Sequence, residues 1–369
     1  MENKIEVFYH NKKVGTIARL NDKYAFQYCE EWISEGFSIS PFTLPLSNEV
    51  FIPSKMIFNG MFGVFADSLP DSWGKLLLDR YLKKQGIKSY DGLYMLACIG
   101  KHGMGALEYK PNFSKSNEKI INFDDYQKQA DLILSDEKSS KIDIDFLYKN
   151  GGSSGGARPK ALVNYNNEEW IIKFQSKYDI DNCGLCEYEY SLACKEIGIN
   201  IPETKLFPSI YNSGYFGIKR FDRKNNEKVH MISASALLEA DYRSPCLDYL
   251  DLFKLTKIIT KDNKKDIEDL YLRMCFNVYA HNLDDHLKNF SYLYDENTNS
   301  YRLSPAYDMV FSNTYYMEHT TSINGKGKDI SDEDLIKVGL ESGLSKTFCV
   351  QKLDLVKKIV LNRLSKYLK

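Results

Sequence analysis

The chain has 369 residues, of which 43% are hydrophobic and 13% aromatic, and these fractions exclude a disordered protein. The length exceeds what one hydrophobic core usually serves, so we expect two or more cores. The 49 basic and 50 acidic residues nearly cancel, which argues against a protein that holds DNA by its own charge.

The first forty residues predict β-structure. Two apolar runs flank the turn HNKK, and a third run follows the residues LND, as in a small meander. The three predicted strands are IEVFY (5–9), VGTIARL (14–20) and KYAFQY (23–28).

Residues 55–110 are predicted to be mostly helical. Within them, SWGKLLLDRYLKK (72–84) places apolar residues at helical spacing. This run follows the residues LPDS, so Asp71 or Ser72 is expected to cap the first turn of the helix.

Two polar stretches, PNFSKSNEK (111–119) and DEKSSK (136–141), are the best candidates for a junction between domains. Between them, FDDYQKQADLILS (123–135) predicts one amphipathic helix. We therefore place the junction near 110–145.

From residue 158 the pattern returns to strand and later becomes helical. PKALVNY and EWIIKF are separated by NNEE, which is a hairpin signal. A helix is expected over 185–197 and should end at Gly198, because glycine suits the left-handed position after a helix. TKLFPSI and YFGIKRF predict further strands. Beyond about residue 233 the expected helices contain SALLEA, LDLFKLTKII, KDIEDLYLRMCFNVYAHN and DLVKKIVLNRLSKYL.

The sequence contains no run of about 18 apolar residues, and its N-terminus lacks the apolar segment of a secretory signal. We therefore expect a cytoplasmic protein that does not enter a membrane. Cys183 and Cys186 form an isolated CxxC with no second Cys or His pair nearby. We interpret them as ordinary thiols, because a zinc site needs four ligands.

The stretch GGSSGGARPK (151–160) is the most glycine-dense part of the chain. Glycines let a backbone approach a phosphate closely and direct several N–H groups at one anion. The spacing matches neither the P-loop nor the kinase GxGxxG pattern, and a flexible surface loop explains it as well. Its position favours a phosphate loop, because it leads directly into the predicted hairpin that carries Lys173.

Lys173 is a charged residue inside the otherwise apolar strand WIIKF. A lysine on the solvent face of a half-buried strand is the ordinary explanation. The alternative is the strand lysine of kinase-like folds, which pairs with nucleotide phosphates and a helix glutamate. Glu187 and Glu189 in the next predicted helix are both candidates for that glutamate, although either one could simply be solvated.

The stretch HNLDDHLKNF (281–290) contains two adjacent carboxylates. Kinase catalytic loops have an aspartate and an asparagine five positions apart, in which the aspartate orients the attacking hydroxyl and the asparagine binds Mg²⁺. Asp284 and Asn289 have that spacing, whereas Asp285 is only four positions from Asn289. The spacing therefore favours Asp284 over Asp285 as the base, although the same spacing often arises by chance.

Asp308 lies about twenty residues beyond Asn289, after a predicted hairpin. By itself it would be interpreted as a turn aspartate, but a kinase needs a second metal-binding carboxylate at this place. Glycine loop, strand lysine, helix glutamate, Asp-x₄-Asn and then Asp is the linear order of the kinase superfamily. The joint order favours a kinase more than any single motif does.

With these motifs the sequence resembles the HipA-type serine/threonine kinases, the toxins of bacterial type II toxin–antitoxin pairs. The resemblance covers nearly the whole chain. It rests on VFYHNKKVGTIARL, FADSLPDSWGKLLLDRY, LACIGKHGMGALEY, SSGGARPKALV, WIIKF, EYEYSLACKEIGINIPE, FGIKRFDR, DDHLKNFS and LSPAYD. It implies an α+β, protein-kinase-like bilobal fold, with a β-rich N-lobe, a helical C-lobe and a small β/α N-terminal subdomain. The implied segments are the N-terminal subdomain 1–110, connecting helix and linkers 111–145, kinase N-lobe 146–225 and helical C-lobe 226–369.

The resemblance also implies a role for individual residues. Asp284 would be the catalytic base, and Asn289 and Asp308 would bind Mg²⁺. The helix glutamate would be Glu189, although Tyr188 replaces the usual Asn of the family pattern. The ATP contacts would come from Ser153, Ser154, Gly155, Gly156, Ala157, Lys160, Lys173, Lys219, Phe221, His286 and Lys288, with Lys219 and Phe221 meeting adenine through backbone groups.

In this family a serine of the glycine loop is autophosphorylated, which ejects the loop and silences the kinase. The register through GGARPK places that serine at Ser153, with Ser154 as the alternative. A phosphoserine would bring about two negative charges into a loop meant for ATP phosphates.

The implied activity is an ATP- and Mg²⁺-dependent Ser/Thr protein kinase that acts as a toxin. Its substrate would be a protein such as an aminoacyl-tRNA synthetase, and its partner a small HipB-like helix-turn-helix antitoxin that supplies most DNA contacts. Two alternatives are a small-molecule kinase on the same scaffold and a non-catalytic co-repressor that binds the antitoxin.

Overall fold

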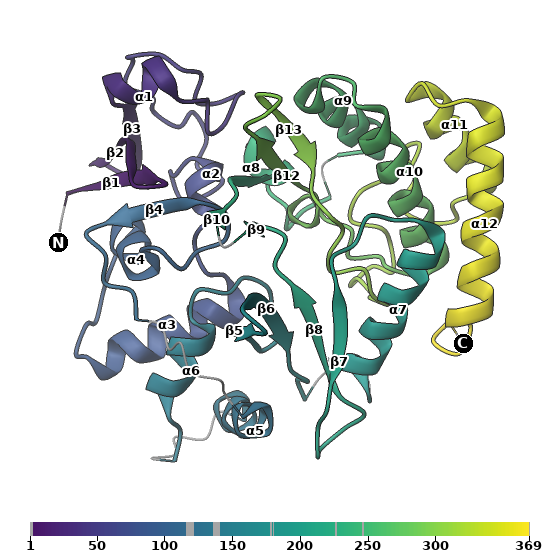
Figure 1. The fold of residues 1–369 in the computed structure, drawn as a ribbon, viewed down its shortest axis with the longest axis horizontal. Coiled ribbons are helices and arrows are strands. Elements are labelled where there is room, and N and C mark those ends of the chain that lie inside the picture. Colours follow the sequence, from purple (N-terminus) through teal and green to yellow (C-terminus); the bar gives the residue numbers. More distant parts are fainter. Residues whose placement is uncertain are drawn as a thin grey trace. The chain divides into compact units, whose positions relative to one another are not determined.

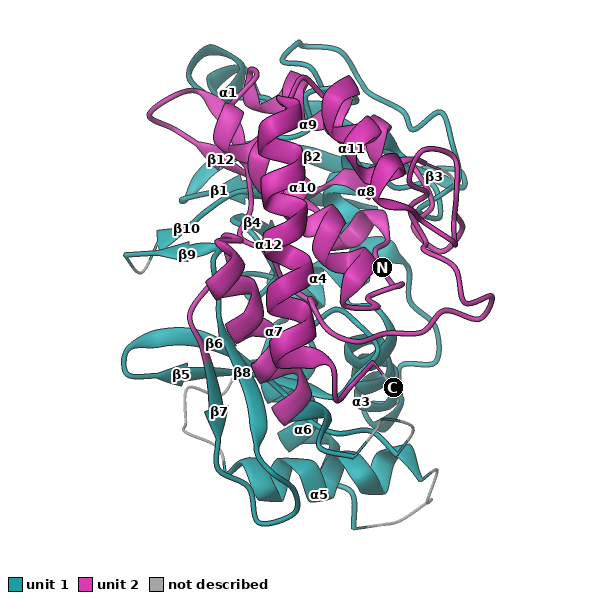
Figure 2. Ribbon diagram, turned by 90° about the vertical axis from the view of Figure 1, so that its right-hand side faces the viewer, with its two compact units in different colours: residues 1–184, 205–232, 236–239 teal, residues 185–204, 233–235, 240–369 magenta. Residues whose placement is uncertain are grey.

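The computed structural model describes residues 3–115, 122–135, 141–177, 179, 181–225, 227–245 and 247–368. These residues fold into two compact units (Figure 2). Unit 1 comprises residues 1–184, 205–232 and 236–239, and unit 2 comprises residues 185–204, 233–235 and 240–369. Each unit is described separately below.

The N-terminal sheet of unit 1 has the strand order β3-β2-β1-β4 (Figure 1). The first three strands form the predicted meander, and alternate residues such as Ile5, Val7 and Tyr9 are buried, as expected for a sheet with one covered face. The strands are β1 (Lys4–Tyr9), β2 (Lys12–Leu20), β3 (Lys23–Tyr28) and β4 (Leu107–Lys110).

Four helices accompany this sheet: α1 (Glu30–Glu35), α2 (Gly63–Ala66), α3 (Ser72–Lys84) and α4 (Gly92–Ile99). Helix α3 begins and ends at the predicted residues. Its apolar residues lie on one buried face, as the helical spacing indicated. The expectation of mostly helix over 55–110 holds only in part, because β4 returns to pair with β1.

The second sheet of unit 1 has the order β5-β6-β8-β7. The predicted hairpin is confirmed: β5 and β6 pair through a two-residue turn in which Asn166 and Asn167 both have positive φ, as tight hairpin turns require. The strands are β5 (Lys160–Tyr165), β6 (Glu168–Lys173), β7 (Thr204–Phe207) and β8 (Tyr215–Lys219), followed by the short pair β9 (Arg223–Lys224) and β10 (Glu227–Lys228).

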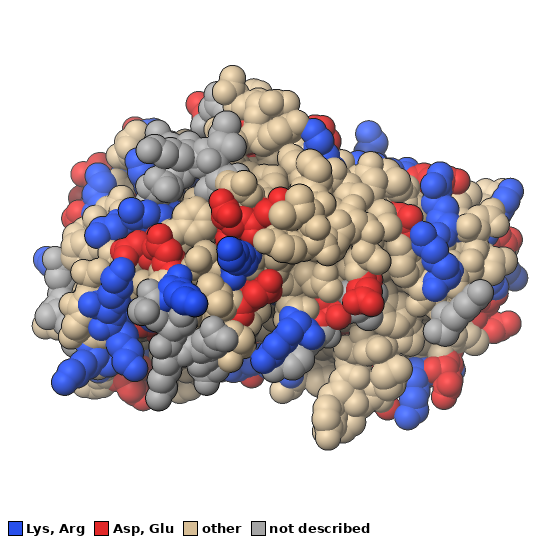
Figure 3. All heavy atoms as spheres, turned by 90° about the horizontal axis from the view of Figure 1, so that it is seen from below, with Lys and Arg blue, Asp and Glu red and all other residues tan. Residues whose placement is uncertain are grey.

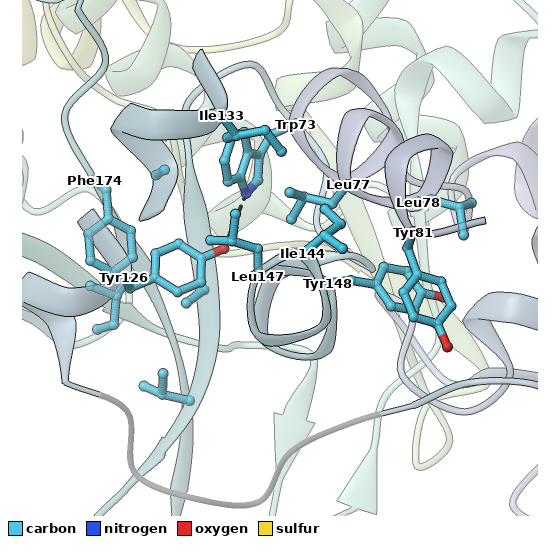
Figure 4. Close-up of a cluster of buried hydrophobic side chains, with 14 of the residues drawn as sticks. Trp73, Leu77, Leu78, Tyr81, Tyr126, Ile133, Ile144, Leu147, Tyr148 and Phe174 are labelled. Atoms are coloured by element: carbon cyan, nitrogen blue, oxygen red, sulfur yellow. Dashed lines mark hydrogen bonds between the residues drawn. The ribbon is translucent and has the colours of Figure 1, made fainter. Parts of the chain in front are cut away.

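Helices α5 (Phe123–Leu134) and α6 (Ile144–Gly151) pack with α3 and this second sheet around one core (Figure 4). Within that core, the Trp73 indole donates to the Tyr126 hydroxyl at 3.3 Å, and Tyr81 stacks on Tyr148. The N-terminal region, the connecting helices and the second sheet are therefore packed as one body.

Unit 2 is mainly helical, as predicted. Helix α10 packs against α9 and α12, and the hairpin strand β13 packs against α9. Its elements are α7 (Cys183–Ile197), α9 (Tyr249–Thr260), α10 (Lys264–Tyr279), β12 (Ser291–Asp295), β13 (Ser300–Leu303), α11 (Asp332–Glu341) and α12 (Lys346–Leu364). The strand β11 (Met231–Ser233) and helix α8 (Ala234–Leu238) lie where the chain passes between the units.

Helix α11 was not predicted, although the chain carries a signal for it. Ser331 and Asp334 form a capping box, in which the Ser331 side chain accepts the Asp334 N–H and the Asp334 side chain accepts the Ser331 N–H. Of the expected junction stretches, residues 116–119 of 111–119 and residues 136–140 of 136–141 lie outside the described residues. Within the part of the chain that is described, no helix is both long and apolar enough to cross a membrane.

Candidate active site

The glycine loop in unit 1 connects α6 to β5. Gly156 has φ +86°, a conformation that L-residues avoid and glycine adopts readily. Ser154 is buried and its hydroxyl donates to the Gly151 carbonyl at 2.6 Å, whereas Ser153 is half-buried. Of the two serines, Ser153 is therefore the more accessible to a phosphoryl group.

The first turn of α3 lies against this loop. The Gly156 N–H donates to the Asp71 carboxylate, and the Gly156 carbonyl accepts the Trp73 N–H at 3.2 Å. A Cβ atom on Gly74 would overlap the Ser154 carbonyl oxygen, so glycine is required there for the close approach. From the sequence, Asp71 was expected only as a possible cap of α3, and no contact with the glycine loop was predicted.

Lys160 and Lys173 are directly opposite each other in the β5–β6 ladder. Paired residues of an antiparallel sheet extend from the same face, so the two lysines lie on one face of the sheet. Lys160 is 8% exposed, and the Lys173 ammonium lies 5.7 Å from the centre of the Phe216 ring. This face of the sheet is therefore suited to phosphate.

Lys219 ends β8, and its ammonium is paired with the Glu168 carboxylate. Its side chain is thus directed to the neighbouring strand, which leaves the backbone for any contact with adenine, as the resemblance implies. Phe221 is half-buried.

The RFDR motif holds the second sheet to the N-terminal region. Asp222 is fully buried and accepts hydrogen bonds from Arg220 and Arg223 and from the Gly105 N–H at 2.7 Å. Arg220 also donates to the Gly103 carbonyl at 3.1 Å. Burial alone would raise the pKa of Asp222, but the two guanidinium groups outweigh it and lower the pKa to about 2.

The catalytic-loop motif lies in unit 2, where residues 287–289 form a 3₁₀ turn after α10. The Asp284 side chain is 54% exposed. The Asn289 side-chain nitrogen donates to the Asp284 backbone carbonyl at 2.8 Å, which fixes the two residues relative to each other. The geometry thus presents the Asp284 carboxylate to solvent beside Asn289.

Asp285 has the opposite environment. Its side chain is 1% exposed and accepts the Tyr249 hydroxyl at 3.0 Å, His319 Nδ1 at 2.9 Å, and the Thr320 and Thr321 backbone N–H groups at 2.9 and 3.1 Å. A carboxylate with four donors is a buried anchor. The two adjacent acids therefore differ in environment, since Asp284 is exposed and Asp285 is buried.

Asp308 follows the β12–β13 hairpin and is half-buried with φ +54°. The Asn282 side chain donates to its backbone carbonyl at 3.3 Å, which ties it to the catalytic-loop segment. With its amide nitrogen on the Asp284 carbonyl, Asn289 has its oxygen as the end that would face a cation. An amide oxygen and a carboxylate are hard donors that fit Mg²⁺.

No group of three or more His, Cys, Asp or Glu side chains suited to a metal occurs among the described residues. This is compatible with Mg²⁺, which usually takes one or two carboxylates together with water and substrate phosphates.

His286 and Lys288 share an aromatic neighbour that sequence reasoning missed. The Tyr242 ring lies 5.2 Å from the His286 ring, and the Lys288 ammonium lies 5.1 Å from the Tyr242 ring centre. Nothing in the local sequence pointed to Tyr242, because it lies more than forty positions before His286.

Glu189, the expected helix glutamate, has other partners. Its carboxylate accepts Lys366 at 2.9 Å and the Tyr367 hydroxyl at 2.7 Å, so it attaches α7 to the C-terminal segment. Residues two positions apart on a helix face different directions. Glu187 therefore lies on another face of α7, where it is 3% exposed. Of the two candidate glutamates, Glu189 is thus engaged with the C-terminal segment, whereas Glu187 is buried.

Two family models match the chain. The HipA N-terminal domain matches residues 5–110, and the HipA-like C-terminal domain matches residues 152–362, which is more than half of the chain.

Two relatives that are named as kinases are also similar to the chain. The candidate kinase Y4dM of Sinorhizobium fredii is 24% identical over 94% of this chain and 87% of its own length. A candidate kinase of Haemophilus influenzae is 26% identical over 43% of this chain and 55% of its own length.

Among solved structures, HipA of Shewanella oneidensis, in a complex with HipB and operator DNA, matches with a TM-score of 0.72. That match covers 99% of this chain and 90% of the other at 18% identity, and it shows that the two chains share a fold. With both domain models matched in order along one α+β, kinase-like chain, the protein belongs to the HipA family.

Proposed function

We propose that the protein is an ATP- and Mg²⁺-dependent serine/threonine protein kinase and the toxin of a toxin–antitoxin pair. The observation that carries the proposal is the contrast within the catalytic loop. Asp284 is exposed and fixed beside Asn289, whereas Asp285 is buried and fully engaged. An exposed carboxylate next to an amide that can bind a metal is what phosphoryl transfer to a hydroxyl needs.

In this proposal the Asp284 carboxylate accepts a hydrogen bond from the hydroxyl of the protein substrate and orients its oxygen toward the γ-phosphate. Lys160 and Lys173 neutralise phosphate charge from one face of the β5–β6 hairpin. The glycine loop contributes backbone N–H groups, and Glu187 takes the role of the helix glutamate.

Asn289 and Asp308 would hold Mg²⁺. When bound, the ion would neutralise charge on the transferring phosphoryl group.

The remaining parts of the proposal come from the family. A HipB-like helix-turn-helix antitoxin is the proposed partner, since the similar HipA structure contains HipB and operator DNA. An aminoacyl-tRNA synthetase is the proposed class of protein substrate. Ser153 is the proposed autophosphorylation site, and its greater accessibility than Ser154 supports this choice.

Figure 3 shows the charge distribution on one face of the molecule. On the face that it shows, basic and acidic side chains are interspersed, as the net charge of −1 would suggest. Strong binding to the DNA backbone requires clustered positive charge.

The test is Asp284→Asn. This exchange keeps the shape but weakens the acceptor, so transfer of γ-phosphate to the protein itself should fall at least about 100-fold. Binding of Mg·ATP, measured by calorimetry, should change less than about threefold. Self-labelling by the Asp284→Asn protein at the wild-type rate would refute the assignment.

A phosphopeptide map of the wild-type protein purified from cells accompanies this measurement. Phosphate on Ser153 is the expected result. A map in which Ser153 is unmodified and other residues carry the phosphate would exclude the proposed autophosphorylation site.

A further inference from the structure

Asp71 occupies the N-cap position of α3 but does not cap that helix. Its backbone has the extended conformation of an N-cap residue, φ −113° and ψ 174°, yet its side chain accepts no hydrogen bond from the helix. A capping aspartate typically stabilises a helix by about 1 kcal/mol. At this position the carboxylate accepts the N–H of Gly156, 85 positions along the chain.

Both backbone polar groups of Gly156 form hydrogen bonds. Its N–H donates to Asp71, and its carbonyl accepts the Trp73 N–H at 3.2 Å. Both partners belong to the start of α3. The orientation of residue 156, which has φ +86° and few intrinsic restraints, is therefore fixed by the N-terminal region.

The two ends of the loop are fixed by neighbouring contacts. At the near end, the Ser154 and Gly152 carbonyls lie so close to Gly74 that a side chain could not be accommodated there. At the far end, the Lys160 carbonyl accepts the Trp73 indole N–H at 3.3 Å and the Tyr126 hydroxyl at 2.8 Å. Between these ends, the half-buried Asp71 side chain accepts the Gly156 N–H, and the Arg158 side chain donates to Asp179 at 2.8 Å.

The negative charge of Asp71 is compatible with a phosphate loop because Lys160 lies beside it. The Lys160 ammonium approaches Gly156 so closely that a Cβ atom on the glycine would overlap it. The ammonium therefore lies beside the peptide that Asp71 holds, and it lowers the cost of bringing phosphates there.

We propose that Asp71 is a positioning residue for ATP: through the Gly156 N–H it holds the glycine loop in the conformation that receives the phosphates. This inference rests on the proposed kinase function and adds the N-terminal region to the nucleotide site. It assigns to the PDSWG segment (70–74) a role in ATP affinity beyond that of starting a helix.

The test compares Asp71→Ala, Asp71→Asn and the control Asp79→Asn. Asp79 lies on the same helix and pairs with Lys75. Asp71→Ala removes the acceptor, so the KM for ATP and the Kd for Mg·AMP-PNP should rise about 10-fold with kcat reduced less than about threefold. Asp71→Asn keeps an oxygen that can accept the Gly156 N–H and should stay within about threefold of wild type, as should Asp79→Asn.

Hydrogen exchange of residues 151–158 in the nucleotide-free proteins gives a second readout. Asp71→Ala should increase exchange in this loop at least about fivefold without changing exchange in β1–β4. Because this readout needs no ATP, it separates the inference from the proposed function. If the wild-type protein bound no nucleotide, the kinase proposal would fail while the loop measurement would still apply.

The inference is overturned if Asp71→Ala exchanges like wild type in the loop, or if it binds nucleotide as tightly as wild type or more tightly. It is also overturned if Asp71→Asn is as impaired as Asp71→Ala, because the effect would then not depend on a hydrogen-bond acceptor.

Discussion

The glycine loop and the catalytic loop are each held by one aspartate, but in different ways. Asp285 is buried and has two side-chain and two backbone donors within unit 2. Asp71 is half-buried and lies at the start of α3, far from the glycine loop in sequence, where it accepts the backbone N–H of Gly156. Removing a buried, fully paired carboxylate leaves several donors without a partner, whereas water can replace a half-buried one. The comparison indicates a rigid catalytic loop and a glycine loop whose conformation can be adjusted.

The largest expected effect is that of Asp285→Ala. Tyr249, His319 and two backbone N–H groups would lose their acceptor, so the free energy of unfolding should fall by about 3–5 kcal/mol. Chemical denaturation followed by circular dichroism measures this. The matched control is Asp284→Ala, an exposed neighbour that should change stability by less than about 0.5 kcal/mol. Equal losses in the two variants would contradict the assignment of anchor and base.

Asp222→Ala tests whether a buried carboxylate also stabilises unit 1, as Asp285 is expected to stabilise unit 2. Asp222 lies outside the glycine loop. The variant leaves Arg220 and Arg223 without their shared carboxylate, and we expect a loss of about 3 kcal/mol. Hydrogen exchange should rise at residues 103–105, whose backbone groups this cluster binds. Asp241→Ala, which removes an exposed pair with Arg243, should cost less than about 1 kcal/mol. A wild-type exchange pattern in Asp222→Ala would show that the cluster does not hold this segment.

The smallest expected effects are those of pH on stability, and they have opposite signs in the two units. His230 in unit 1 is fully buried with Nε2 on the Ile39 carbonyl, and burial lowers its pKa to about 4. Its unfolded pKa is near 6.5, so between about pH 6.5 and 4 the unfolded chain binds more protons. The stability of unit 1 should therefore fall on acidification through this range, by about 2 kcal/mol.

The pKa of Asp266 in unit 2 is shifted in the other direction. Burial raises its pKa to about 6. Its neutral form is favoured in the folded protein, so unit 2 should gain on the order of 1 kcal/mol as the pH falls from about 6 to 4. Exchange rates followed separately in the two units between pH 7 and 4 measure both trends. His230→Gln should abolish the trend in unit 1 and Asp266→Asn the trend in unit 2. A trend that persists in either variant would assign it to other groups.

Much of the fold could be predicted because its signals are local. Strands β1–β3, helix α3 and the Asn-Asn hairpin follow from alternation, helical spacing and turn chemistry within short windows. Helix α11 was missed although its capping box is equally local, and β4 could not be recognised because a short strand depends on its partner β1.

The candidate site was predictable to the extent that spacing encodes it. The five-residue step from Asp284 to Asn289 selected the exposed acid before its exposure was known. Spacing could not select between Glu187 and Glu189, because both lie in one helix and only the contacts of Glu189 with Lys366 and Tyr367 separate their faces. Nor could it find Tyr242 beside His286.

The sequence alone determined the order of the elements, the glycine-rich and Asp-x₄-Asn motifs, and the family to which they point, since all of these depend on residue type and on short separations. Only the tertiary structure decided that Asp285 is buried, that Asp222 joins the second sheet to residues 103–105, and that Asp71 holds the glycine loop instead of capping α3. The reason is that a carboxylate has the same chemistry wherever it occurs in the chain. Its role depends on which donors the fold brings within about 3 Å of it.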